Sequence, residues 1–426
     1  MAHTFSERLK RLLTERYETS VFRRTFLLLA LIVPAFAANF FVLYVCAHWL
    51  GAAEFGVFYA ANTIGNILFS GSLILNLAFT RYLSSVLAAQ GAPGLLAGAL
   101  KVQRTVMLWG GAIAATLIAS GLVAGNRIGV RSAIVVVLIV LDAYTAYVGD
   151  VARVLLQTAR RTIALGLYTL VWMTLRLLLC IVGLLWIGTV WGALSGIVLS
   201  SLIVIGVANI TLLHRAQVSA DRVARLPTLA SELPAILGYA LLITVSNLDI
   251  LVGYFILPSV GFGVYSASSI LPKAILTVLM PLQQMLFPHM LVSGTSREAE
   301  RRFRQKAALV VVGLAVAGGI FTAAVEPFAC GASPGILLCQ PALMNIMLLS
   351  VVPLALVRVL LLEDIVGHRP LRAYFLLVPL VGFAIWAKNS ALGQETVMAW
   401  GYLACCFMAT LALAALRTLP NFGRIP

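Results

Sequence analysis

The sequence predicts an all-α polytopic membrane protein, with about twelve transmembrane helices in two pseudo-symmetric six-helix lobes around a central cavity. Three observations lead to this. Hydrophobic residues make up 61% of the chain and charged residues only 11%, with a mean hydropathy of +1.01, whereas soluble domains carry roughly 25% charged residues. Apolar runs long enough to span a bilayer recur throughout. One segment recurs 207 residues later, which indicates two equivalent halves.

Twelve apolar segments have the length of membrane-spanning helices. Strands are not expected, because a chain in lipid must satisfy its backbone hydrogen bonds internally. The predicted spans are residues 24–46, 55–80, 105–124, 132–150, 163–187, 189–213, 234–257, 261–291, 305–327, 340–361, 371–387 and 395–416.

The basic residues indicate how the chain is oriented. The N-terminal segment and the even-numbered connections carry most of the Lys and Arg, whereas the odd-numbered connections hold only Arg127, Arg131 and Lys388. Cytoplasmic loops carry the Lys/Arg excess in membrane proteins. Both termini are therefore expected in the cytoplasm. The net charge of +15 is explained by this distribution and by anionic lipids, so no nucleic-acid partner is expected.

The chain divides into five parts. Residues 1–23 form a basic, amphipathic cytoplasmic segment, interpreted either as a helix on the inner leaflet or as a solvated tail. Residues 24–213 form the N-terminal six-helix lobe, 214–233 a polar cytoplasmic connector, 234–416 the C-terminal lobe, and 417–426 a cytoplasmic tail.

The internal repeat aligns LGAAEFGVFYA at residues 50–60 with LPSVGFGVYSA at 257–267. Secondary transporters with such repeats place their substrate site between the two halves. The positions that match are Leu50 with Leu257, Phe55 with Phe262, Gly56 with Gly263, Val57 with Val264, and Ala60 with Ala267.

Four charged residues lie deep within the predicted spans. They are Asp142, Arg176, Asp249 and Lys273. A charge at the bilayer centre costs roughly 2.5–3.5 kcal/mol on insertion scales, so such residues are usually functional or paired. Lys273 shares a helix face with Ser266, Ser269 and Thr277, Asn62 and Asn66 form a polar stripe on the second span, and Asn247 precedes Asp249 on the seventh. These stripes predict a shared aqueous cavity.

A second interpretation of the charges stays open. Asp249 and Lys273 flank one turn at similar depth, and Asp142 and Arg176 flank another. Either pair could be a buried ion pair that fixes helix register and binds nothing. For Asp249, pairing and the binding of a coupling H⁺ or Na⁺ both remain open.

Enzymatic and metal motifs are missing from the sequence. There is no G-x-x-x-x-G-K-[ST] loop, no H-E-x-x-H and no Cys/His cluster, so an enzyme is not expected and no cofactor is predicted beyond a coupling ion. Most of the six cysteines lie in or beside apolar spans, where cysteine acts as a small hydrophobe. Cys330 and Cys339 flank an outer turn and are either a disulfide or two free thiols.

The chain resembles the polysaccharide transporter family in two segments. One holds Leu50, Gly51 and EFGVF at 54–58, followed by a polar-faced span that ends in RYLS at 81–84; the other is NLDILVGYFILPSVGFGVYSASSILPKAI at 247–275. These proteins are the O-antigen and exopolysaccharide repeat-unit flippases of the multidrug/oligosaccharidyl-lipid/polysaccharide exporter superfamily. The resemblance implies two lobes around a cationic cavity with alternating access. It also implies a bacterial inner (plasma) membrane location, and polysaccharide polymerase machinery as a partner.

The same resemblance implies a substrate and residue roles. The substrate would be an undecaprenyl-diphosphate-linked oligosaccharide, flipped from inner to outer leaflet for surface polysaccharide synthesis. Lys273 and Arg176 would bind the diphosphate, Asn62, Asn66 and Asn247 the headgroup, and Asp249 the coupling ion. A cationic lining of only two residues departs from the family pattern.

Three alternative functions stand beside this one. A multidrug or organic-cation exporter of the same superfamily would use Asp142 and Asp249. A lipid II flippase is the second, although that family tends to have longer chains. A membrane polymerase or ligase is disfavoured, because the predicted outer loops are short.

Overall fold

The computed structural model describes residues 27–28, 30–128, 130–159, 161–215, 229–292, 309, 312–313, 316–324, 340–366, 370–389 and 394–416. All regular structure within these ranges is helical, and none of these residues lies in a strand. The prediction of an all-α membrane protein is confirmed. Cys330, Cys339 and most of the connector at 214–233 lie outside the described residues, so the disulfide and the five-part division remain predictions.

The N-terminal half consists of six helical segments. A helix at Ala30–Trp49 is followed by α2 (Gly51–Phe69), α3 (Ser72–Ile128), α4 (Val130–Thr158), α5 (Thr162–Ile187) and α6 (Val190–Arg215). The expected loop between the second and third spans is helical. The interruption in α3 is at Gly91, with φ 69° and ψ −162°, a backbone conformation that residues with a Cβ rarely adopt.

The C-terminal half contains α7 (Leu229–Ser246), α8 (Leu248–Ile256), α9 (Ser259–Val292), α11 (Pro341–Val366), a 3₁₀ segment η2 (Pro370–Leu376), α12 (Leu377–Asn389) and α13 (Glu395–Leu416). The ninth predicted span, 305–327, is described only in part, and residues 316–324 are helical.

The seventh predicted span is broken, which the sequence did not predict. Helices α7 and α8 meet at an angle of 56°, and Asn247 between them has a non-helical φ of −131° and ψ of 12°. No proline lies at this break. Ser246 and Asn247 have side chains that compete with the helix for backbone hydrogen bonds, which lowers helix propensity without forbidding a helix.

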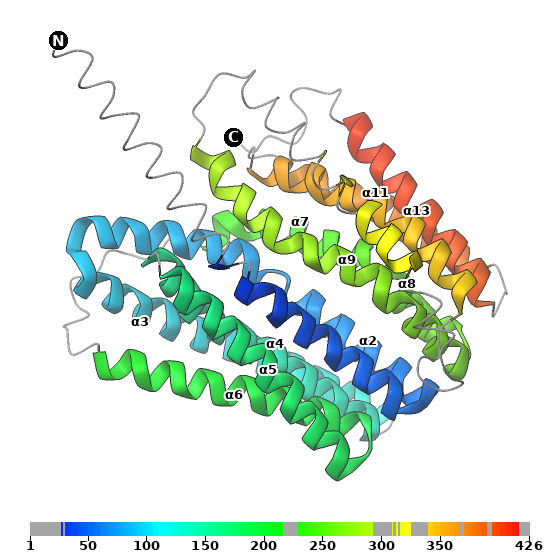
Figure 1. The fold of residues 1–426 in the computed structure, drawn as a ribbon, viewed down its shortest axis with the longest axis horizontal. Helices are drawn as coiled ribbons and strands as arrows, with labels where there is room; N and C mark the ends of the chain where they lie inside the picture. The colour runs from blue at the N-terminus through cyan, green and yellow to red at the C-terminus, as the bar shows by residue number, and fades with distance from the viewer. Residues whose placement is uncertain are drawn as a thin grey trace.

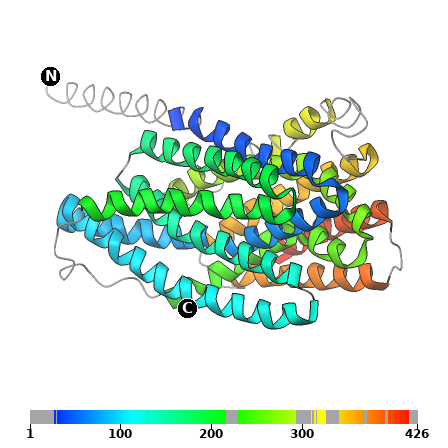
Figure 2. The ribbon, with the colours of Figure 1, turned by 90° about the horizontal axis from the view of Figure 1, so that it is seen from below.

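Seven of the described helices are long and apolar enough to cross a membrane, or eight if the bent pair α7–α8 counts as one span. One of them, Gly51–Val123, covers two predicted spans. The helices of the N-terminal half, coloured blue to green, group apart from those of the C-terminal half in Figure 1, whereas in the view of Figure 2 the two groups overlap. This arrangement is consistent with the predicted architecture of twelve spans in two lobes.

The two halves meet along α2, which packs against α8 and α9. One hydrophobic cluster crosses this boundary, with Phe55 and Phe58 from α2 beside Ile250 and Tyr265 from the other half. Large apolar side chains such as Trp186 and Phe255 are more than 80% exposed on the outside. This is the arrangement expected of a protein whose outer surface contacts lipid.

Candidate functional site

A buried ion pair lies in the C-terminal half, close to the broken span. Lys273 Nζ on α9 lies 2.7 Å from Asp249 Oδ1 in the first turn of α8, and their side chains are 14% and 0% exposed. The Tyr265 hydroxyl donates to the other carboxylate oxygen of Asp249 at 3.3 Å. Both oxygens of this carboxylate are therefore engaged.

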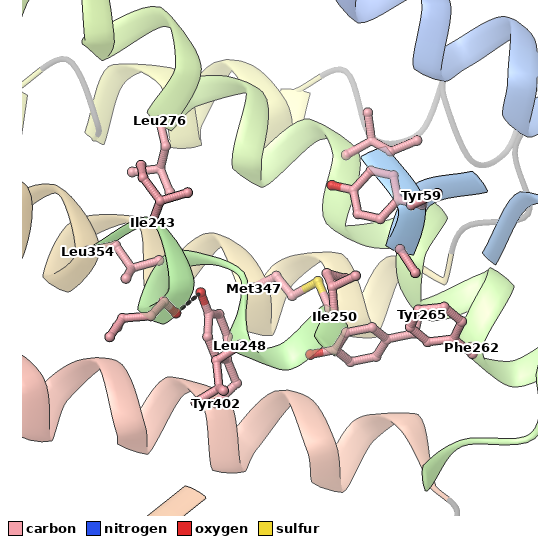
Figure 3. Packing of buried hydrophobic residues seen from close by; sticks show 14 of the residues in the cluster. Tyr59, Ile243, Leu248, Ile250, Phe262, Tyr265, Leu276, Met347, Leu354 and Tyr402 are labelled. Carbon is pink, nitrogen blue, oxygen red and sulfur yellow. Dashed lines mark hydrogen bonds between the residues drawn. The ribbon is translucent and has the colours of Figure 1, made fainter. Parts of the chain in front are cut away.

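Tyr402 of α13 joins this pair to the break. Its hydroxyl donates to the carbonyl oxygens of Ser246 at 2.8 Å and Val245 at 3.3 Å, and Lys273 Nζ lies 5.6 Å from the centre of its ring. A helix that stops at Ser246 leaves its last carbonyls without helical donors. The Tyr402 hydroxyl supplies a hydrogen-bond donor from another helix, α13, as Figure 3 shows.

A second ion pair lies in the N-terminal half. Arg176 Nη2 on α5 lies 2.9 Å from Asp142 Oδ2 on α4, with side chains 12% and 17% exposed. Ser201 of α6 donates to Asp142 Oδ1 at 3.3 Å, and the Trp172 indole donates to Ser201 at 3.3 Å. Arg176 Nε is buried and has no hydrogen-bond partner in the structure. One carboxylate thus joins three helices.

The ion pairs that the sequence left open are therefore present. In this conformation neither Lys273 nor Arg176 offers an unpaired cation, and neither Asp142 nor Asp249 an unpaired carboxylate. The two pairs lie in different halves and do not form one site. The roles of these residues in substrate and ion binding stay predictions.

The three predicted headgroup residues lie on α2 and at the break between α7 and α8. On α2, Asn62 is half-buried and Asn66 is exposed. The Asn247 amide donates to the Ile243 carbonyl oxygen at 2.9 Å, so it caps its own helix end. Their predicted role in headgroup binding also stays untested.

Arg358 is missing from the predicted set of intramembrane charges. It lies on α11 and is 6% exposed. It donates to the Leu276 carbonyl oxygen at 2.9 Å, while its Nε is buried without a partner. Within the described part of the chain no carboxylate pairs with it. The sequence pattern does not single out Arg358 as a deep charge, because it lies close to the end of its predicted span.

Other buried charges are matched by a partner. Asp150 pairs with Arg153 at 2.9 Å and accepts from Asn76 at 3.0 Å, and Arg372 lies 3.2 Å from Asp364. Among the described residues no cluster of His, Cys, Asp and Glu could hold a metal ion. The thiols of Cys46 and Cys180 are buried 3.6 Å apart.

No protein-family model matches the sequence, and no curated protein sequence matches it either. Solved structures do match. The inward-facing structure of a multidrug resistance MATE family transporter of the MOP superfamily aligns with a TM-score of 0.67 at 13% identity, over 91% of this chain and 96% of that one. The outward-facing structure gives 0.64 at 14% identity, over 92% and 95%.

The chain has the fold of the MATE transporters. A third match is a MOP superfamily transporter from Pyrococcus furiosus, with a TM-score of 0.61 at 14% identity over 92% of this chain and 96% of that one. The binding pocket of that protein is described as having reverse polarity, which suggests a different function for it. At these identities the likeness to MATE transporters establishes the fold. The substrate has to be inferred from the residues of this chain.

Proposed function

We propose that this chain is a membrane transporter that exports its substrate by alternating access between its two lobes. The observation that carries the proposal is the two-lobed MATE fold, which aligns over more than nine-tenths of the chain with one inward-facing and one outward-facing structure. These neighbours are transporters, which supports a function without catalysis. A bacterial inner membrane location with both termini cytoplasmic, and coupling to H⁺ or Na⁺ at Asp249, are parts of the same proposal.

The first candidate substrate is a drug or organic cation. Two of the matching structures are of multidrug resistance transporters, so the comparisons favour this alternative over the flippase. A cationic substrate would compete with Lys273 for Asp249, or with Arg176 for Asp142. The attraction of the carboxylate would then offset the cost of removing the substrate from water, and the displaced Lys273 or Arg176 would need water or another partner.

The second candidate is the lipid-linked oligosaccharide of the flippase function. The observation in its favour is charge. The carboxylates of Asp142, Asp150, Asp249 and Asp364 each have a cation partner, and Arg358 is a further buried cation with no carboxylate partner among the described residues. The Pyrococcus furiosus match supports the view that this fold accommodates pockets of different polarity.

The physical chemistry of a polyprenyl diphosphate is compatible with this candidate. Its diphosphate could take Lys273 or Arg176 from their carboxylates, with Asn62, Asn66 and Asn247 near the sugars, and its tail could stay in lipid. Export of about two negative charges from an inside-negative cell releases roughly 4–5 kcal/mol per 100 mV. Surface polysaccharide polymerase machinery would be the partner that uses the product.

One strain pair separates the candidates. A deletion strain, with and without the plasmid-borne gene, is assayed for resistance to a panel of cationic drugs and for surface polysaccharide. Lower resistance with normal polysaccharide supports the exporter, and the reverse supports the flippase. A deletion strain unchanged in both, together with no uptake of either substrate class by proteoliposomes, would contradict both candidates.

The Lys273→Ala variant, expressed at the wild-type level, tests the site within whichever candidate survives. It is expected to lose transport while it still inserts into the membrane. Undiminished transport would remove Lys273 from the substrate-binding residues.

A further inference from the structure

The repeat carries a feature that the proposed function does not use. On α2, Ala52, Gly56 and Ala60 stand at every fourth position, and a shift of 207 residues places Ser259, Gly263 and Ala267 at the equivalent positions of α9. Small residues at this spacing line one helix face and let transmembrane helices approach closely. Each half of the protein therefore carries the same small-residue face.

The structure packs these two faces against each other. A Cβ added at Gly263 would overlap the Ala52 carbonyl oxygen and lie 2.8 Å from Ala52 Cα, which is backbone of the other half. A Cβ added at Gly56 would lie 2.8 Å from Phe262 Cδ1 and 3.3 Å from the Gly263 nitrogen. The repeat-equivalent glycines thus mark the crossing point of the two helices.

We propose that this glycine crossing is the contact that closes the outer end of the transporter and that parts when the substrate leaves. Helices α2 and α9 begin at Gly51 and Ser259, and the distribution of basic residues puts these starts on the outer side. Dispersion contacts of small residues are worth only about 0.1–0.2 kcal/mol per atom pair. Such an interface is tight when closed, and its rupture leaves no buried charge without a partner.

The crossing also covers the buried ion pair. Tyr59, one helical turn beyond Gly56, is 4% exposed and belongs to the same hydrophobic cluster as Tyr265, which donates to Asp249; Figure 3 shows its ring pointing toward the C-terminal half. When α2 leaves α9, Tyr59 leaves this cluster with it. The crossing therefore controls access from the outer side to Asp249 and Lys273, an inference that rests on the proposed alternating access.

The test measures separation of the two helices without any substrate. In a variant whose six native cysteines are replaced by serine, Ala60→Cys reports on the crossing, because Ala60 is 4% exposed in the closed arrangement. Intact cells are treated with a membrane-impermeant maleimide. The wedge variants are Gly263→Val and Gly56→Val. The matched control is Gly382→Val on α12, where an added Cβ would meet no atom within 4 Å.

Gly263→Val is expected to raise labelling of the reporter by on the order of tenfold, because its neighbour is backbone that cannot move aside. Gly56→Val should raise it less, since the ring of Phe262 can rotate. Adding Phe262→Ala should reduce the effect of Gly56→Val, whose remaining close neighbour is the Gly263 nitrogen at 3.3 Å, and should leave that of Gly263→Val. Gly382→Val should leave labelling unchanged.

The proposal is overturned if Gly263→Val inserts normally and its reporter stays unlabelled, or if Gly382→Val raises labelling equally. If Gly263→Val fails to insert, Gly263→Ala replaces it under the same criteria. The labelling result is independent of transport, so the two proposals can fail separately. A fully labelled Gly263→Val protein that still transports at the wild-type rate would contradict alternating access. It would still show that α2 and α9 part at the glycine crossing.

Discussion

Removing one member of the Asp249–Lys273 pair should be far more damaging than removing both charges. In Lys273→Met the carboxylate of Asp249, whose side chain is fully buried, would remain without its cation. Breaking a buried pair in this way costs about 3–5 kcal/mol of folding free energy, whereas replacing both members by neutral groups is often neutral or stabilising. Asp249→Asn keeps an acceptor for the Tyr265 hydroxyl and is the natural partner substitution.

The assay compares the free energy of unfolding of the wild type, the two single variants and the double variant in mixed detergent–SDS micelles. We expect each single variant to lose about 3–5 kcal/mol, and the double variant to lie within about 1 kcal/mol of the wild type. The corresponding single and double variants at Asp142 and Arg176 should give a smaller interaction energy between the two residues, because those side chains are 17% and 12% exposed.

Transport by the double variant separates structure from function. If the pair only fixes helix register, the stable double variant transports normally. We expect it to be stable and inactive, because a site that binds substrate or a coupling ion through Lys273 or Asp249 has lost both charges. Single variants that lose less than about 1 kcal/mol would refute the buried pair, and a fully active double variant would refute its role in transport.

Three further predictions concern the helix break at Tyr402, the buried Arg358 and the orientation in the membrane. Tyr402→Phe should lower the free energy of unfolding by about 1–3 kcal/mol, because two carbonyls at the helix break lose their donor; Tyr144→Phe, which removes an exposed bond to the Met107 carbonyl, should change it by less than about 0.5 kcal/mol. Arg358→Met should leave the free energy of unfolding unchanged or raise it, while it lowers transport of an anionic substrate and spares that of a cationic one. Alkaline phosphatase fused after residue 416 should be inactive and fused within 188–189 active, and the opposite result would reverse the orientation.

The sequence left the pairing of the deep charges open as one of two interpretations, but it placed the members of each pair at a common depth for a simple geometric reason. Asp249 and Lys273 flank one short turn, and so their depths are set by helix rise alone. Asp142 and Arg176 were placed in the same way. Helices joined by a short connection must be antiparallel neighbours, so local spacing was sufficient to bring each pair to the same depth.

The broken span and Arg358 could not be reached by the same reasoning. Nothing at Asn247 forbids a helix, and the break is satisfied by Tyr402, which is more than 150 residues away. Arg358 is buried because its helix, α11, packs against α13, α9 and α7. Hydrogen bonds to such distant donors and acceptors have no signature in the hydropathy of a single segment.

The amino-acid sequence by itself determined the helical membrane class, the repeat and the depth of the charges, because hydropathy and helix rise act within one segment. Only the tertiary structure decided which faces of the two repeats meet, that Gly56 and Gly263 mark their crossing, and that the deep cations are paired in this conformation. The physical reason is that side-chain direction in space depends on how helices far apart in the chain pack.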